Sequence, residues 1–152
     1  MRALLCLMVT FTVGCEPLPS NVVEVRVLGT VYIEGIQPDM QRPAIELPDT
    51  VSAATPFTVS VITEVGGCLR GGEADETEVE VNGNSAVITP YDYSTSSLDG
   101  GSSHICTDDL RFAGHMAQVT FGAPGEGTVV VRSRTSDLDA TPIEYEYAVW
   151  VE

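Results

Sequence analysis

Few side chains in this sequence could support metal or redox chemistry. It has two histidines, His104 and His115, and Cys106 and Met116 lie near them in the chain. Two histidines, a cysteine thiolate and a weak axial methionine form the ligand set of a blue-copper site. The interval between Cys106 and His115 is wider than the short loop that carries these ligands in such sites. We therefore expect no copper and place both histidines at the surface.

A nucleophilic serine is the next possibility, because Ser102 and Ser103 directly precede His104. Catalysis by serine needs a base held against the hydroxyl and a preorganised oxyanion hole. No nucleophile elbow accompanies these residues, which lie in a polar run that predicts a loop over 92–109. We expect a non-catalytic protein. An enzyme would require His104 or His115 to be buried beside a second titratable group.

Acidic side chains offer the remaining chemistry. Calcium binds six to eight oxygen atoms, which carboxylates on neighbouring loops can supply. No spacing matches an EF-hand loop, so most acidic clusters are expected to be solvated surface and no cofactor is expected. If a calcium site exists, the weak candidates for its ligands are Asp108, Asp109, Asp137 and Asp139.

Charge and composition exclude several classes of partner. The chain has 152 residues, and its 22 acidic and 7 basic side chains give a formal net charge of -15. All basic residues are arginines scattered singly, so the chain has no clustered positive charge for nucleic acid or for an anionic membrane surface. A hydrophobic fraction of 43% indicates a globular chain of one domain. The acidity favours cationic partners and opposes self-association.

The N-terminus reads as a targeting segment. Arg2 precedes an apolar stretch from Ala3 to Val13, which is too short to span a bilayer. The following Gly14-Cys15 resembles the cleavage site of bacterial lipoprotein precursors. The resemblance implies a signal peptide over 1–14, lipid on Cys15 and a short proline-containing tether over 15–21.

Two further cysteines then remain in the mature chain. Cys68 and Cys106 are expected to form a disulfide in an oxidising compartment. The loop would contain about 38 residues, for which the chain-entropy model gives about 4 kcal/mol of stabilisation.

From residue 22 onward, apolar residues alternate with polar ones, which predicts strands. The first run is long, with a bulge at Gly29, and a short edge strand lies between Pro43 and Pro48. Asn82-Gly83 predicts a hairpin with a type I′ turn. In the last run, Tyr145 and Tyr147 share the buried face and Trp150 is half exposed. We expect one antiparallel β-sandwich of about 7–9 strands over 22–152, with little helix.

Part of this pattern resembles bacterial immunoglobulin-like domains. The matching segments are 45–51 with 55–61, which resemble the opening of such domains, and 124–131, which resembles their late hairpin. The resemblance implies an immunoglobulin-like sandwich, in which the disulfide would connect loops at the edge.

Together these observations predict a non-catalytic lipoprotein of the bacterial cell envelope, periplasmic or surface-facing, that acts as an interaction or structural module. Its partners would be the membrane, through Cys15, and an unidentified envelope protein or polysaccharide, bound by loops at 66–76 and 92–109. The alternative is a periplasmic protein that binds a small molecule or a metal such as calcium. A ligand-binding protein needs a concave pocket, whereas an interaction module does not.

Overall fold

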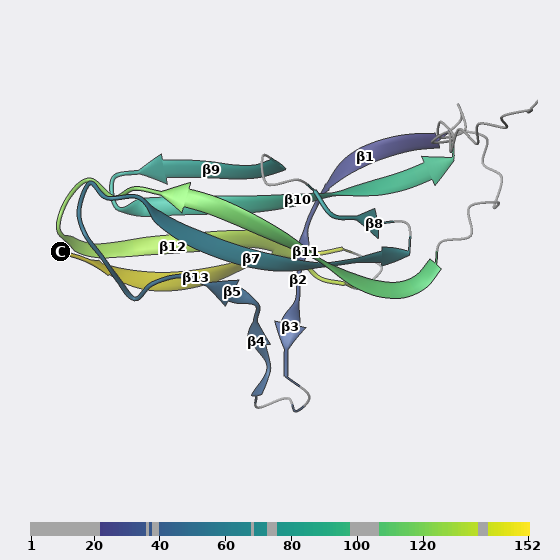
Figure 1. Ribbon diagram of the computed structural model, residues 1–152, viewed down its shortest axis with the longest axis horizontal. Coiled ribbons are helices and arrows are strands. Elements are labelled where there is room, and N and C mark those ends of the chain that lie inside the picture. Colours follow the sequence, from purple (N-terminus) through teal and green to yellow (C-terminus); the bar gives the residue numbers. More distant parts are fainter. Residues whose placement is uncertain are drawn as a thin grey trace, which may run out of the picture.

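The computed structural model describes residues 22–35, 37, 40–67, 69–72, 76–97, 107–136 and 140–152. Within these residues the chain is all-β and contains no α-helix (Figure 1). No helix long and apolar enough to cross a membrane is found among them. The strands are β1 (Val22–Leu28), β2 (Thr30–Val31), β3 (Ile33–Glu34), β4 (Arg42–Pro43), β5 (Ile45–Glu46), β6 (Thr50–Val51), β7 (Phe57–Gly67), β8 (Leu69–Arg70), β9 (Thr77–Asn82), β10 (Ser85–Ser97), β11 (Thr107–Val119), β12 (Gly125–Arg134) and β13 (Pro142–Val151).

These strands form two main sheets and a small hairpin. The larger sheet has the order β1-β10-β12-β13-β6, with β8 and β9 also on β10. The smaller sheet has the order β11-β7-β2, with β5 also on β7, and β3 pairs with β4. Side chains from both main sheets share one apolar core, an arrangement consistent with a β-sandwich. Figure 1 shows β3 and β4 projecting from the body as an arm.

The core follows the predicted alternation. Val59 and Val61 of β7, Val129 and Val131 of β12 and Val149 of β13 are buried, and the residues between them face outward or are only partly covered. Phe57 and Phe121 make an edge contact at 5.2 Å between ring centroids. Along β13, the exposure of Trp150 and the partial burial of Tyr145 and Tyr147 agree with the expected faces.

Strand pairing differs from the expected antiparallel pattern at two places. The first part of β10 runs parallel to β12, and β6 runs parallel to β13. The second arises because the chain passes from β5, which pairs with β7, to β6, which pairs with β13 in the other sheet. Consecutive short strands of the chain thus belong to different sheets.

The first strand is likewise divided at Gly29, where a bulge was expected. β1 pairs with β10 of the larger sheet, whereas β2 pairs with β7 of the smaller one. The predicted buried face does not persist along β1, because Val25 is exposed. Figure 1 shows why: β1 and the end of β10 diverge from β7 and β11.

One turn and two loops also differ from expectation. The β9–β10 hairpin forms as predicted, with Asn82 opposite Ser85, but only Gly83 has positive φ (61°). A type II′ turn has this pattern, whereas type I′ needs positive φ at both central residues. The expected loop over 92–109 is strand at both described ends, because β10 continues to Ser97 and β11 begins at Thr107. The expected 66–76 loop likewise begins within β7 and contains β8.

Candidate functional site

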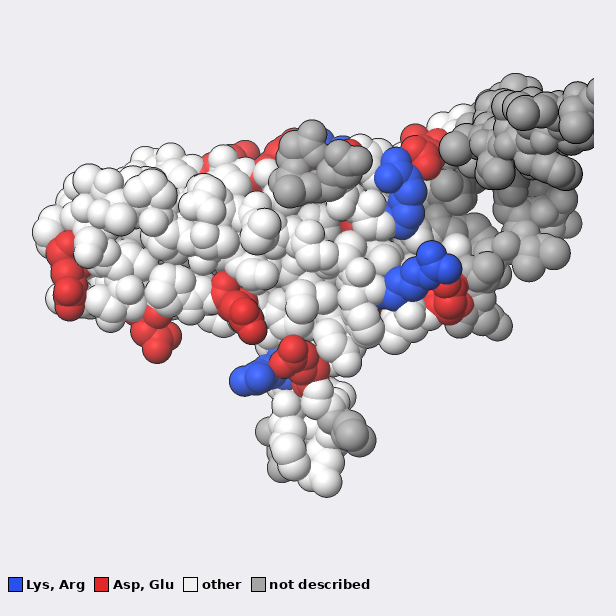
Figure 2. Space-filling view, in the orientation of Figure 1, with Lys and Arg blue, Asp and Glu red and all other residues white. Residues whose placement is uncertain are grey.

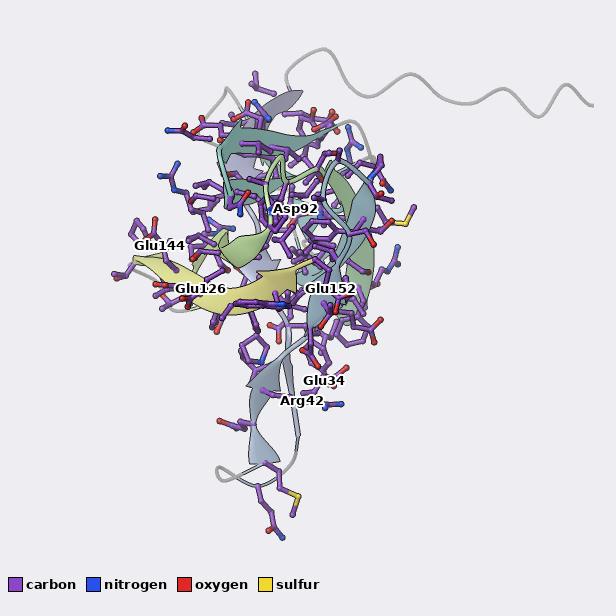
Figure 3. All side chains as sticks on the ribbon, turned by 90° about the vertical axis from the view of Figure 1, so that its left-hand side faces the viewer. Glu34, Arg42, Asp92, Glu126, Glu144 and Glu152 are labelled. Carbon is purple, nitrogen blue, oxygen red and sulfur yellow. The ribbon has the colours of Figure 1, made fainter. Side chains whose placement is uncertain are left out.

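A buried polar cluster occupies the interior where the two sheets meet. His115 of β11 is 0% exposed and Asp92 of β10 is 1% exposed. Their Nε2 and Oδ1 atoms lie 3.3 Å apart. The expectation that His115 lies at the surface is therefore wrong. Figure 3 labels Asp92, which lies within the body of the molecule.

Each partner of Asp92 comes from a different element. Its Oδ1 accepts hydrogen bonds from the Thr63 hydroxyl at 3.3 Å and from the Gly72 backbone N–H at 3.1 Å. Its Oδ2 is buried and has no hydrogen-bond partner in the described structure. This oxygen lies against Gly29, where an added Cβ would be 3.0 Å from it.

The imidazole of His115 is held from both sides. Nε2 lies 3.1 Å from Thr63 Oγ1, and Nδ1 lies 3.2 Å from Thr77 Oγ1 on β9. If Thr63 donates to Asp92, Nε2–H donates to Thr63. Nδ1 then accepts a hydrogen bond from the Thr77 hydroxyl in the neutral imidazole, or donates one to it in the imidazolium. Either the neutral Nε2–H tautomer or the imidazolium satisfies this geometry. The cluster thus joins β7, β9, β10 and β11, which belong to both main sheets.

The residue types in this cluster are those of a nucleophile, a base and an orienting carboxylate. The condition set for an enzyme, a histidine buried beside a second titratable group, is met at His115. A reacting atom would still need access, and Thr63, Asp92 and His115 are each almost wholly enclosed. The geometry suits a hydrogen-bonded link between the sheets, since buried polar groups are stable only when partnered.

The sequence contains a signal for this cluster in the polar residues at inward strand positions. Thr63 continues the buried parity of Val59 and Val61, and Asp92 continues that of Ala86 and Ile88. Ser133 does the same on β12, where its hydroxyl donates to Gly29 O and accepts from Val31 N–H. Polar residues at inward positions of several strands indicate a shared interior network.

The outer face of the smaller sheet carries the second notable feature, an exposed apolar strip on β11 formed by Leu110, Phe112 and Met116. They are 62%, 53% and 61% exposed, respectively. The Phe112 ring also contacts Tyr32, with ring centroids 4.6 Å apart. In Figure 2 the surface over β7 and β11 carries few charged side chains. Contiguous exposed apolar surface of this kind marks interaction sites.

A shallow pocket lies beside this face, at the base of the arm. Figure 3 shows Glu34 and Arg42 side by side there, and the two side chains form an ion pair at 3.1 Å. Ile62 and Ser60 of β7 contribute to the same pocket. Glu64, the next outward residue of β7, lies opposite Phe112, and burial raises the pKa of its carboxyl.

Most of the residues predicted from the sequence fall outside the described residues. These are Cys15, Cys68, Cys106, His104, Asp137 and Asp139, together with the signal segment and the tether. Of the calcium candidates, Asp108 and Asp109 lie on β11, and the Asp109 carboxylate pairs with Arg111. Among the described residues, no three His, Cys, Asp or Glu side chains converge to hold a metal.

Comparisons with protein-family models, with curated proteins and with solved structures found no match for this chain.

Proposed function

We propose that this protein is a membrane-anchored lipoprotein of the bacterial cell envelope that acts as a non-catalytic interaction module. The single observation that carries the interaction role is the apolar strip of β11, formed by Leu110, Phe112 and Met116. Stable folding would favour burying these side chains, so their exposure on a strand face is best explained by a partner. The enclosure of Asp92 and His115 supports a structural rather than a catalytic role for the polar cluster.

The anchor follows from the sequence. Lipid on Cys15, with the tether over 15–21, would bring β1 close to the bilayer because β1 begins at Val22. Several acyl chains on one cysteine bury enough methylene groups for stable anchoring. The Cys68–Cys106 disulfide would close the chain between β7 and β11, the two longest strands of the smaller sheet.

An immunoglobulin-like relationship is part of the same proposal. It is supported by the short opening segment, which divides between the sheets as β5 and β6. The turn expected to close a late hairpin within 124–131 instead connects β11 of the smaller sheet to β12 of the larger one. The parallel pairing of β10 with β12 distinguishes this chain from a wholly antiparallel sandwich.

Intact mass spectrometry of the protein extracted from membranes tests the anchor and the disulfide together. We expect a chain that begins at Cys15 and carries acyl mass, with two further thiols that react with an alkylating reagent only after reduction. A Cys15→Ser variant is the matched control and should leave the membrane fraction. A soluble, unacylated wild-type chain with Cys68 and Cys106 already reactive would contradict the proposal.

Crosslinking in the membrane tests the interaction role. A photoreactive residue at Met116 should form adducts, whereas one at Trp150, which is similarly exposed on the larger sheet, should form few. Equal labelling from both positions would argue against a specific surface on β11.

A further inference from the structure

The backbone of β11 has an open edge. β11 is the last strand of the smaller sheet and pairs only with β7 among the described strands. The N–H and C=O of Ile62 point away from β11, because they bond Ala44 O and Tyr32 N–H. In an antiparallel ladder the bonding direction alternates, so Val61 and Thr63 bond to β11.

This alternation identifies the open groups of β11. His115 lies opposite Val61 and Ala113 lies opposite Thr63, so these odd-numbered residues bond to β7. The N–H and C=O groups of Phe112, Gly114 and Met116 therefore point to the open edge. In the described structure no backbone hydrogen bond engages them, and β9, the strand of the larger sheet nearest to β11, does not pair with them.

The side chains of Phe112 and Met116 also belong to the outer apolar strip. Between Phe112 and Val119 the only titratable side chain is the buried His115. A Cβ at Gly114 would meet no atom within 4 Å, so the surface is open at the centre of the segment. An edge segment without exposed charge and with an apolar outer face is a template for pairing with another strand.

We propose that a second copy of this chain pairs with β11 in antiparallel register, with a two-fold axis at Gly114. This inference rests on the proposed role of the outer face as an interaction surface, and it names the partner. In this register Phe112 lies opposite Met116 of the second copy, which gives two favourable sulfur–aromatic contacts. These paired rings and thioethers make the apolar strips of the two copies continuous, and Leu110 lies opposite Gln118 of the second copy at each end.

Charge is compatible with this register although the chain is strongly acidic. Arg111 would lie opposite Ala117 of the second copy, and Asp108 and Asp109 fall in the irregular part of β11 before the regular ladder begins at Leu110, so no like charges face each other within that ladder. The remaining repulsion acts at longer range and is screened by salt. The pairing would join two four-stranded sheets into one, with an isologous interface as two-fold symmetry requires.

A cysteine on the proposed axis gives a direct test. Gly114→Cys in the full chain should form a disulfide-linked dimer under mild oxidation, because directly hydrogen-bonded residues have Cα atoms about 5.5 Å apart, within disulfide reach. Gly122→Cys, at another open glycine, and the wild-type chain are the matched controls. We expect at least a tenfold excess of dimer for Gly114→Cys on non-reducing gels.

A second pair of variants tests the open edge without a new thiol. Gly114→Pro removes an N–H on the open side and should abolish the dimer, since proline is tolerated at edge positions with an unpaired N–H. Gly114→Ala should leave the dimer intact, and circular dichroism should show that both variants fold. Sedimentation analysis of the purified full chain gives its mass in solution and so distinguishes a monomer from a dimer.

The outcomes separate the inference from the proposed function. A wild-type chain that is monomeric in solution, with no excess crosslinking at Gly114→Cys, would overturn the second copy as partner. If Gly114→Cys instead forms disulfides with a different envelope protein, the dimer is overturned and the interaction role stands. If the dimer forms on a chain without acyl mass, the dimer stands and the proposed anchor fails.

Discussion

At the scale of single residues, the interior of this protein is not uniformly apolar. Thr63, Asp92 and His115 occupy positions that the alternation of their strands directs inward, next to a core of valines. Burying these groups is costly unless they bond to one another. The bonds from Thr63, Thr77 and Gly72 meet most of that requirement, which gives the two sheets a specific relative placement.

Removing the Asp92 carboxylate should destabilise the fold. We expect Asp92→Ala to lower the free energy of unfolding by about 3 kcal/mol, because His115 would lose a buried partner. Asp49→Ala, at an exposed position, should change it by less than about 0.5 kcal/mol. Chemical denaturation followed by tryptophan fluorescence measures both.

A double-mutant cycle checks the mechanism of that loss. His115→Ala combined with Asp92→Ala should cost at least about 1 kcal/mol less than the sum of the single changes, because the two side chains contact each other. Additive losses would mean that each residue acts through other contacts.

The carboxyl of Glu64 should make stability depend on pH. Burial raises the pKa of Glu64 in the folded chain, so the folded state binds this proton more tightly than the unfolded state. The stability from this residue is complete below the unfolded pKa and is lost as pH rises through the folded pKa.

Glu64→Gln should therefore stabilise the protein at neutral pH, by at most about 0.5 kcal/mol because the carboxyl is only partly buried. At about pH 3 both forms are uncharged and the difference should vanish. Thermal melts at the two values measure this, with the exposed Glu80→Gln as control. An equal gain at both pH values would show that charge is not the cause.

At the scale of secondary-structure elements, the passage of the chain between the sheets requires a residue without a side chain. Gly29 separates β1 from β2, and its N–H donates to Pro90 O at 2.9 Å. A Cβ there would lie 2.8 Å from Thr63 Cγ2 and 3.2 Å from Pro90 O. The crossing therefore packs directly on the polar cluster.

Gly29→Ala should consequently cost about 2 kcal/mol or more, because a backbone atom and a buried carboxylate would have to move. Gly122→Ala, where a Cβ would meet nothing within 4 Å, should be neutral or stabilise by up to about 1 kcal/mol. Comparison of the two midpoints of urea unfolding tests this. Similar midpoints would show that the crossing at Gly29 has room to relax.

At the scale of the whole molecule, the 22 acidic side chains outnumber the 7 basic ones. Arg26, Arg70 and Arg132 each pair with a glutamate on the larger sheet. The hydrogen bond from Arg70 lowers the pKa of the Glu24 carboxyl. These pairs neutralise only part of a formal charge of -15, so the folded chain repels itself.

Added salt should therefore stabilise the fold. Raising sodium chloride from about 10 mM to about 500 mM should raise the melting temperature by a few degrees at pH 7, because the Debye length shrinks from about 30 Å to below 8 Å. Near pH 4.2, the isoelectric point, the same addition should have little effect. A similar rise at both pH values would point to an effect of salt on apolar burial instead of charge screening.

The sequence by itself determined the all-β character of this protein and which faces of β7, β12 and β13 are buried, because strand periodicity is local. It also located the β9–β10 hairpin, since the turn depends on adjacent residues such as Gly83. It missed most of β11, where Phe112 and Met116 face outward and the small Ala113 and Ala117 face inward, which reverses the usual hydrophobic signal.

Only the tertiary structure decided which strands become neighbours. The crossing at Gly29, the parallel pairing of β10 with β12 and the meeting of Asp92 with His115 all join residues that are distant in the chain. Alternation gives each strand a buried side but does not specify which strand covers it. The interior cluster and the open edge of β11 depend on that choice, and so they emerge only from the folded chain.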